Sequence, residues 1–138
     1  MKAKLTYVNG MKFVAEADSG HAIVLDAAPE HGGENAGLRP SELLLIATGG
    51  CSAMDVISIL KKKKQEVTGF EINVSGDKVE THPKRFRKVI VEYVVKGKNI
   101  SDEAVARAIE LSMTSYCSVK TTIEGGVPVE YTHRIIEE

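Results

Sequence analysis

The segment from Pro40 to about Gln65 constrains the fold more than any other part of this 138-residue chain. Its proline suits the first position of a helix, where a missing N–H has no partner to lose. The apolar side chains are not confined to one stripe, as they are on a surface helix, so most of the circumference of this helix must be packed. They are Leu43, Leu44, Leu45, Ile46, Ala47, Met54, Val56, Ile57, Ile59 and Leu60. We predict a long central helix over about 40–65, covered in part by a second subunit because the chain is short and only 5% aromatic.

Part of this helix approaches the length of a membrane span, but polar residues interrupt it. Thr48, Ser52 and Asp55 all fall between Leu43 and Leu60. Such residues are rare in lipid, so they indicate a helix buried in a globular domain. The composition, 43% hydrophobic and 27% charged, is also that of a globular protein, and the length suits one domain over 1–138.

Alternating apolar residues predict strands on both sides of the central helix. Asn9-Gly10 separates two alternating runs and predicts a two-residue hairpin turn. Ser101, followed by two acidic residues, predicts the cap of a second helix. The expected elements are N-terminal strands within 2–26 (2–9, 11–17 and 21–26), a loop over 27–39, the central helix, strands within about 70–96 (70–79 and 87–96), a second helix over about 101–116 and a closing strand over about 127–136. This order predicts an α+β fold.

The charge pattern bears on partners and compartment. A net charge of −1 gives no general attraction to nucleic acid or to an anionic membrane, so we expect neither as a partner. The basic run Lys61–Lys64 lies at the C-terminal end of the predicted central helix, where lysines stabilise the helix dipole without a ligand. Residues 1–7 alternate as a strand does and contain no apolar signal-peptide region. We therefore expect a cytoplasmic protein whose cysteines stay reduced outside a catalytic cycle.

The chain has two cysteines, and they are its candidates for chemistry. Cys51 lies inside the central helix, and Cys117 follows the second helical pattern. They can be a peroxide-reducing thiol with its resolving partner, or two inert buried side chains. The chain has no CxxC and no HxxxH spacing, so we expect neither a metal site nor a cofactor.

The residues around both cysteines form a recognisable pattern. Its parts are Pro40, Glu42, Leu43-Leu44, Ala47, Gly49-Gly50 and Cys51, then Tyr116-Cys117-Ser118-Val119. With the order of the elements, this pattern resembles the OsmC/Ohr family of osmotically inducible and organic hydroperoxide resistance proteins over nearly the whole chain. The resemblance implies an OsmC-like fold: an intertwined homodimer with antiparallel sheets packed around two long central helices and active sites at the subunit interface.

The resemblance also implies a function, thiol-dependent reduction of organic hydroperoxides to alcohols. Cys51 would be the peroxidatic thiolate, which attacks the O–O bond and becomes a sulfenic acid. Cys117 would resolve that acid to a Cys51–Cys117 disulfide. A dithiol reductant, of the lipoyl type or thioredoxin-like, would then restore both thiols.

The chain departs from the characterised members of that family in two charged positions. Those members have a carboxylate directly after the proline, whereas here Ser41 takes that place and the carboxylate is Glu42. They also carry an arginine on an early strand, whereas residues 1–38 contain none. An apolar helix raises the pKa of a thiol, so a cation must compensate. The candidates are Arg39, which adjoins Pro40, and Arg85 and Arg87.

Two carboxylates share the central helix with Cys51. Glu42 precedes Cys51 by nine residues, about 13 Å along a continuous helix. Unless the helix breaks at Gly49-Gly50, Glu42 would serve Cys51 from the other subunit. Asp55 lies one turn after Cys51 on the same face, where its charge would raise the thiol pKa. We interpret Asp55 as a buried hydrogen-bonding group at the dimer seam.

The departures keep a second hypothesis open. On the same dimeric scaffold, the chain would bind a small apolar ligand or sense redox state without catalysis. A lowered pKa of Cys51 discriminates the two hypotheses, because only the peroxidase needs its thiol ionised near neutral pH.

Overall fold

The computed structural model describes all residues, 1–138, and its contacts divide the chain into two compact units. The first unit is Met1–Leu44 and the second is Leu45–Glu138. The boundary falls within the central helix, α1 (Pro40–Lys62), which was predicted over about 40–65 and is unbroken at its glycine pair. The two units are described separately.

The first unit is built on a three-stranded antiparallel sheet. Its strands, in the order β1-β2-β3, are β1 (Ala3–Tyr7), β2 (Phe13–Ala17) and β3 (Ala22–Leu25). The predicted two-residue turn is wrong, because the connection between the first two strands runs from Val8 to Lys12. The N–H of Lys12 donates to the carbonyl of Asn9 (2.8 Å), which places Asn9 first in the turn rather than at its centre.

A buried carboxylate organises the loop that follows β3. Asp26 is 3% exposed and accepts the backbone N–H groups of Ala27, Glu34 and Ala36 at 2.8–3.0 Å. This loop contains the short 3₁₀ helix η1 (Pro29–His31). The three bonds stabilise the loop that leads into α1.

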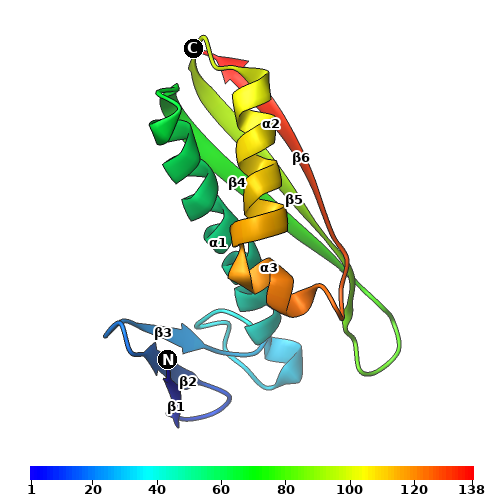
Figure 1. Ribbon diagram of the computed structural model, residues 1–138. Helices are drawn as coiled ribbons and strands as arrows, with labels where there is room; N and C mark the ends of the chain where they lie inside the picture. The colour runs from blue at the N-terminus through cyan, green and yellow to red at the C-terminus, as the bar shows by residue number, and fades with distance from the viewer. The chain divides into compact units, whose positions relative to one another are not determined.

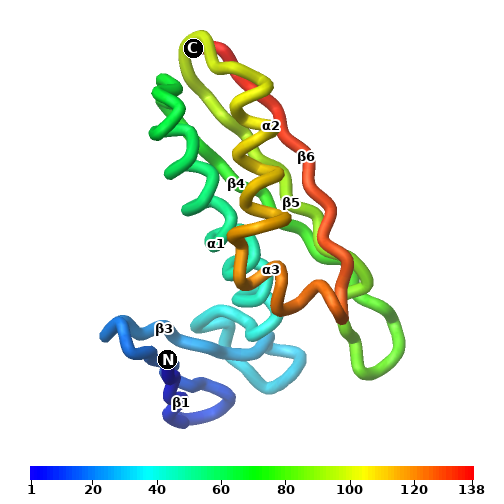
Figure 2. Tube along the Cα trace, viewed as in Figure 1, coloured from blue at the N-terminus to red at the C-terminus, as the bar shows by residue number.

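The second unit has a mixed sheet in the order β4-β5-β6. Its strands are β4 (Glu66–Lys78), β5 (Phe86–Lys98) and β6 (Val129–Glu137). The first pair is antiparallel, but β6 runs parallel to β5, so the expected purely antiparallel arrangement is wrong here. The cause is the helical connection after β5, which carries the chain back along the sheet before β6 begins (Figure 2).

That connection consists of three helical segments. They are α2 (Asp102–Leu111), a π-helical turn η2 (Ser112–Tyr116) and α3 (Ser118–Ile123). Ser101 caps α2 as predicted, accepting the N–H of Ala104 at 3.2 Å. The predicted helix over 101–116 thus changes its hydrogen-bonding pattern at Ser112, and α3 was not predicted.

Both long helices of the second unit cover one face of the mixed sheet (Figure 1). Alternate residues of β5 face them and are completely buried: Val89, Val91, Tyr93 and Val95. α1 approaches β4 closely at Gly49, where an added Cβ would lie 2.5 Å from Cγ2 of Val74. The glycine therefore sets how near the helix lies to the sheet.

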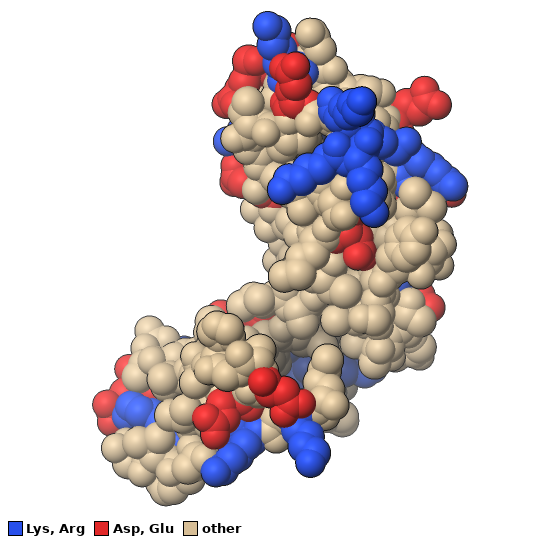
Figure 3. Space-filling model, turned by 60° about the vertical axis from the view of Figure 1, so that its left-hand side comes forward, with Lys and Arg blue, Asp and Glu red and all other residues tan.

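The other side of α1 carries large apolar side chains without cover from its own unit. Met54 is 74% exposed and Ile46 is 54% exposed. By length and composition α1 could span a membrane, although core helices pass the same test, and 28% of its most apolar window is buried. The exposed lysines Lys61–Lys64 lie at its C-terminal end, the first two inside the helix and the last two just after it, and Figure 3 shows basic side chains gathered on that part of the unit.

Candidate active site

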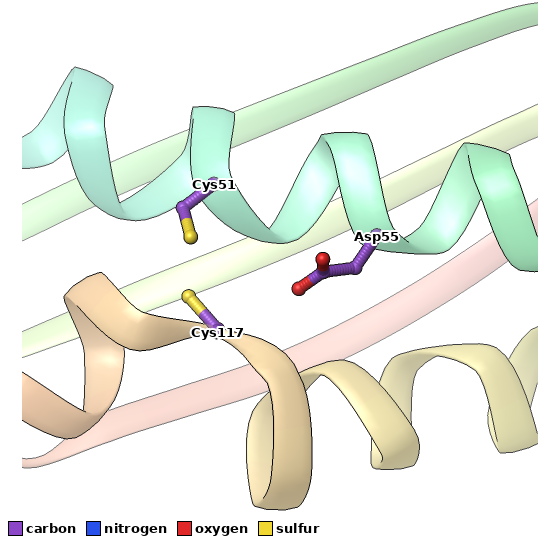
Figure 4. Close-up of side chains that lie close together, drawn as sticks. All are labelled: Cys51, Asp55 and Cys117. Atoms are coloured by element: carbon purple, nitrogen blue, oxygen red, sulfur yellow. The ribbon is translucent and has the colours of Figure 1, made fainter.

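The second unit brings the two cysteines together. Both are free thiols, Cys51 on α1 and Cys117 at the residue before α3 (Figure 4). Their sulfurs and a carboxylate oxygen of Asp55 all lie within 4.8 Å of one another. These three side chains, two thiols and a carboxylate, are also the residues that could hold a thiophilic metal ion.

The π-helical turn η2 positions Cys117. The N–H of Cys117 donates to the carbonyl of Ser112 (2.7 Å), which closes the wide turn, and Cys117 then becomes extended. Its sulfur accepts the N–H of Lys120 at 3.4 Å, as a capping side chain does at a helix start. Cys117 is 1% exposed, and it faces α1 at the level of Cys51.

Hydrogen bonds favour the thiolate form of Cys51. Burial acts to raise the pKa of this thiol, but four donors together lower it below its ordinary value. The donors are the backbone N–H of Val119, the thiol of Cys117, and the hydroxyl and N–H of Ser118. The sulfur of Cys51 lies 3.9 Å from the Ser118 hydroxyl. The segment that begins α3 thus supplies the stabilisation that was expected from a cation.

The opposite holds for Cys117. Burial raises its pKa to about 11; the N–H of Lys120 opposes this, while Cys51 and Asp55 add to it. Cys117 is therefore the protonated member of the pair and donates its S–H to Cys51. A thiol of lowered pKa beside a thiol of raised pKa is the arrangement in which one sulfur attacks and the other waits.

A chain of buried hydroxyl groups ends on Asp55. The hydroxyl of Ser112 donates to Oδ2 of Asp55 (2.9 Å), and the hydroxyls of Ser52 and Ser112 are 2.8 Å apart. Ser52 in turn bonds the hydroxyl of Tyr93, whose pKa is raised to about 12 by burial. Ser52, Ser112 and Tyr93 are each 0% exposed. Reasoning from the sequence missed this group of three hydroxyls. The only signal was polar residues inside apolar patterns, which are helical for Ser52 and Ser112 and those of a strand for Tyr93.

The candidate arginines of the second unit have other partners. Nη1 of Arg87 pairs with Asp77 at 3.2 Å on the surface, and Nη1 of Arg85 donates to the carbonyl of Phe86 at 3.4 Å. Neither arginine is among the groups that lower the pKa of Cys51.

Arg39 and Glu42 belong to the first unit and meet at the start of α1. A carboxylate oxygen of Glu42 accepts the backbone N–H of Arg39 (2.8 Å), which is one half of a capping box. The guanidinium of Arg39 donates to Asn35 (2.9 Å) and to the carbonyl of Gly37 (3.0 Å). In this arrangement both residues stabilise the entry to the helix.

The first unit also contains an apolar cavity of about 430 Å³. Apolar side chains line most of it, with polar groups at Asp26, His31 and Arg39. Its volume falls in the range of small-molecule sites.

Comparisons with known proteins agree with the fold. The sequence pattern of the family described as OsmC-like protein matches residues 32–132. Protein YhfA of Escherichia coli K12 is 37% identical over 99% of this chain and 98% of its own. The crystal structure of a hypothetical protein from Aquifex aeolicus VF5 is similar, with a TM-score of 0.86 and 31% identity over 99% of this chain and 96% of that one. The organic hydroperoxide resistance protein OhrB of Bacillus subtilis shares the fold, with a TM-score of 0.62 and 22% identity over 97% and 98% of the two chains.

Proposed function

This chain belongs to the family of OsmC-like proteins, and on that premise we propose that it is a thiol-dependent peroxidase for organic hydroperoxides. The observation that carries the proposal is the pairing of a Cys51 thiol of lowered pKa with a Cys117 thiol of raised pKa, their sulfurs within 4.8 Å. Inert buried cysteines need no such difference, whereas a two-cysteine cycle needs one thiolate and one waiting thiol.

The cycle has three steps. The Cys51 thiolate attacks the distal peroxide oxygen, the O–O bond breaks, and the alkoxide leaves as an alcohol after taking a proton. Cys117 then attacks the Cys51 sulfenic acid, which forms the disulfide and releases water. A dithiol reductant, lipoyl-type or thioredoxin-like, reduces that disulfide by thiol exchange.

The proposal includes a homodimer that acts in the cytoplasm. A second copy covering Ile46 and Met54 on the open side of α1 would bury apolar surface that its own unit leaves exposed. Arg39 and Glu42 are proposed site residues that would act on a Cys51 thiol, with Glu42 reaching it from the other subunit. The hydrogen bonds that Arg39 and Glu42 make at the start of α1 would then fix their positions for that contact.

Peroxide consumption by the reduced protein tests the proposal. With a dithiol present, the wild-type protein should consume cumene hydroperoxide faster than hydrogen peroxide. Cys51→Ser should abolish turnover, and Cys117→Ser should let Cys51 over-oxidise to the sulfinic acid. Ser75→Ala, an exposed change on β4 away from the open side of α1, is the matched control and should keep full activity. Equal peroxide consumption by wild type and Cys51→Ser would exclude the peroxidase.

A second candidate function is favoured by the apolar cavity of the first unit. In that case the chain binds a small apolar ligand, or senses redox state, without turnover. Phe13 lines the cavity, so Phe13→Ser should weaken binding of an apolar fluorescent probe at least tenfold. Saturable probe binding by a wild-type protein that consumes no peroxide would place this function first.

A further inference from the structure

Three side chains of the second unit converge on one point. Cys51 and Asp55 lie one turn apart on α1, and the fold brings Cys117 beside them from the segment before α3, so the sequence showed no zinc motif (Figure 4). Their sulfurs and a carboxylate oxygen lie within 4.8 Å of one another. Around a tetrahedral zinc ion, with Zn–S bonds of about 2.3 Å and a Zn–O bond of about 2.1 Å, neighbouring ligand atoms lie about 3.5–4 Å apart. A contraction of about 1 Å, within reach of side-chain rotation, therefore places all three atoms on one ion.

The chemistry of the three ligands selects the ion. Two cysteine sulfurs favour a thiophilic metal over Mg²⁺ or Ca²⁺, because those hard cations bind through oxygen. A carboxylate as the third ligand disfavours Cu(I), which prefers soft ligands, and suits Zn²⁺, which binds both sulfur and oxygen. Three protein ligands leave the fourth tetrahedral position to a water molecule, which is the pattern of an open zinc site.

Buried hydroxyl groups orient the carboxylate of Asp55. The hydroxyl of Ser112 donates to its Oδ2 (2.9 Å), which leaves Oδ1 for an ion. The hydroxyl of Ser112 is also 2.8 Å from that of Ser52, which in turn bonds the hydroxyl of Tyr93. Carboxylates that bind metals in proteins are hydrogen-bonded in this way, because the outer partner fixes the orientation of the ligand. The three hydroxyls thus give Asp55 the support that a metal ligand needs.

Backbone N–H groups support the two sulfurs. The N–H of Lys120 donates to the Cys117 sulfur at 3.4 Å. The N–H groups of Ser118 and Val119 donate to the Cys51 sulfur. Such bonds stabilise the negative charge that a sulfur carries when it binds a metal. Cys51 is only partly buried, so an ion has a path to the site.

We propose that the reduced protein binds one Zn²⁺ ion per chain through the sulfurs of Cys51 and Cys117 and a carboxylate oxygen of Asp55. The ion replaces the thiol protons, which pass to solvent, and no electron is transferred. The site goes beyond the proposed function and does not depend on it, but one consequence rests on that function. Zinc binding and peroxide reduction use the same two sulfurs, so bound zinc protects the thiols from oxidation, and the Cys51–Cys117 disulfide binds no zinc.

Titration of the reduced, chelator-treated protein with Zn²⁺ alone tests the site. Calorimetry should give one ion per chain for wild type, and Co²⁺ in its place should give the strong visible absorption of a tetrahedral site with a sulfur-to-cobalt band. Cys51→Ser and Cys117→Ser should each lose saturable zinc binding, and Asp55→Asn should bind zinc more weakly but keep the sulfur-to-cobalt band. Asp77→Asn removes a carboxylate from the surface pair with Arg87, and this matched control should bind as wild type does.

A further variant keeps the test decisive if Asp55→Asn folds poorly. Ser112→Ala keeps all three ligands, and its zinc affinity should fall about 10- to 100-fold, as it does when a metal ligand loses its outer hydrogen bond. No saturable zinc binding by wild type, or equal binding by Cys51→Ser and Cys117→Ser, would overturn the site. Wild-type affinity in both Asp55→Asn and Ser112→Ala would overturn the three-ligand assignment.

Oxidation of the zinc-loaded protein separates this inference from the proposed function. With one equivalent of cumene hydroperoxide, the loaded protein should form the Cys51–Cys117 disulfide more slowly than the metal-free protein, and a chelator should restore the rate. Equal rates with zinc bound would overturn the protection. One bound zinc ion in a wild-type protein that never forms the disulfide would instead keep the zinc site and overturn the proposed function.

Discussion

At the scale of single residues, Cys51 shows how a thiol inside an apolar helix can still have a lowered pKa. The expected compensating group was an arginine, but the donors are N–H and hydroxyl groups of Ser118 and Val119 with the thiol of Cys117. Nearly every residue has a backbone N–H group, so no side chain in the sequence indicates which N–H groups will lie near Cys51. They come near only because α3 begins beside α1, which is a property of the tertiary fold.

Substitutions at Ser118 test whether its hydroxyl and N–H lower the pKa of Cys51. Ser118→Ala removes the hydroxyl and keeps the backbone N–H, whereas Ser118→Pro removes both. Proline is tolerated here because Ser118 is the first residue of α3 and Cys117 before it is extended. The pKa of Cys51 should rise from wild type to Ser118→Ala and again to Ser118→Pro.

Alkylation of Cys51 by iodoacetamide, followed against pH, measures that order. The rate rises with pH as the thiolate forms and levels off above the pKa, so each substitution should move the curve to higher pH. Cys117, with its pKa of about 11, should react only at the alkaline end. Three superimposable curves for Cys51 would contradict the assignment of these donors.

At the scale of elements, local sequence patterns predicted where the long helices begin. They did not predict features that depend on contacts between distant parts of the chain. The start of α1 and the cap of α2 were predicted from Pro40 and Ser101, because helix ends have local chemistry. α3 was missed because its six residues, rich in β-branched side chains, have weak helix propensity. The direction of β6 was missed because an alternating pattern is the same in parallel and antiparallel pairs.

The residues of the candidate site show the same difference between what a sequence pattern predicts and what only the fold reveals. The partnership of Cys51 with Cys117 was predicted from a family resemblance, whereas the three hydroxyls that end on Asp55 come from separate elements and have no shared motif. Only the fold brings them into one chain.

The adjacent glycines of α1 provide a matched test of its packing. A Cβ on Gly49 would lie 2.5 Å from Cγ2 of Val74, whereas a Cβ on Gly50 meets nothing within 4 Å. Gly49→Ala should therefore destabilise the protein by about 1–3 kcal/mol, as overpacking does. Gly50→Ala should stabilise it by about 0.5–1 kcal/mol through the better helix propensity of alanine. Chemical unfolding of both variants measures the difference, and a Gly49→Ala protein as stable as Gly50→Ala would contradict this packing.

At the scale of the whole molecule, the exposed apolar side of α1 is the strongest argument for a second subunit. Met54 and Ile46 lie two turns apart on that helix and are 74% and 54% exposed. Exposed apolar surface of this kind marks an interaction site when it is contiguous. A charge placed there would have to be buried without a partner when two copies meet.

Met54→Lys should accordingly convert the proposed dimer to monomers. Light scattering after size-exclusion chromatography gives the molar mass, and Glu80→Lys, an exposed change in the β4–β5 connection, controls for added charge. The expected result is about half the wild-type mass for Met54→Lys and the wild-type mass for the control. A wild-type protein with the mass of one 15.0 kDa chain would exclude the dimer.

The most direct test of the proposed peroxidase is whether an organic peroxide makes Cys51 and Cys117 form a disulfide. The reduced protein is exposed briefly to one equivalent of cumene hydroperoxide, and its intact mass and peptides are determined, with hydrogen peroxide as the comparison. The pairing of a Cys51 thiol of lowered pKa with a Cys117 thiol of raised pKa predicts the rapid loss of two hydrogens and a Cys51–Cys117 linked peptide, both faster with the organic peroxide. Two unchanged thiols after that exposure would contradict the peroxidase and favour the ligand-binding function.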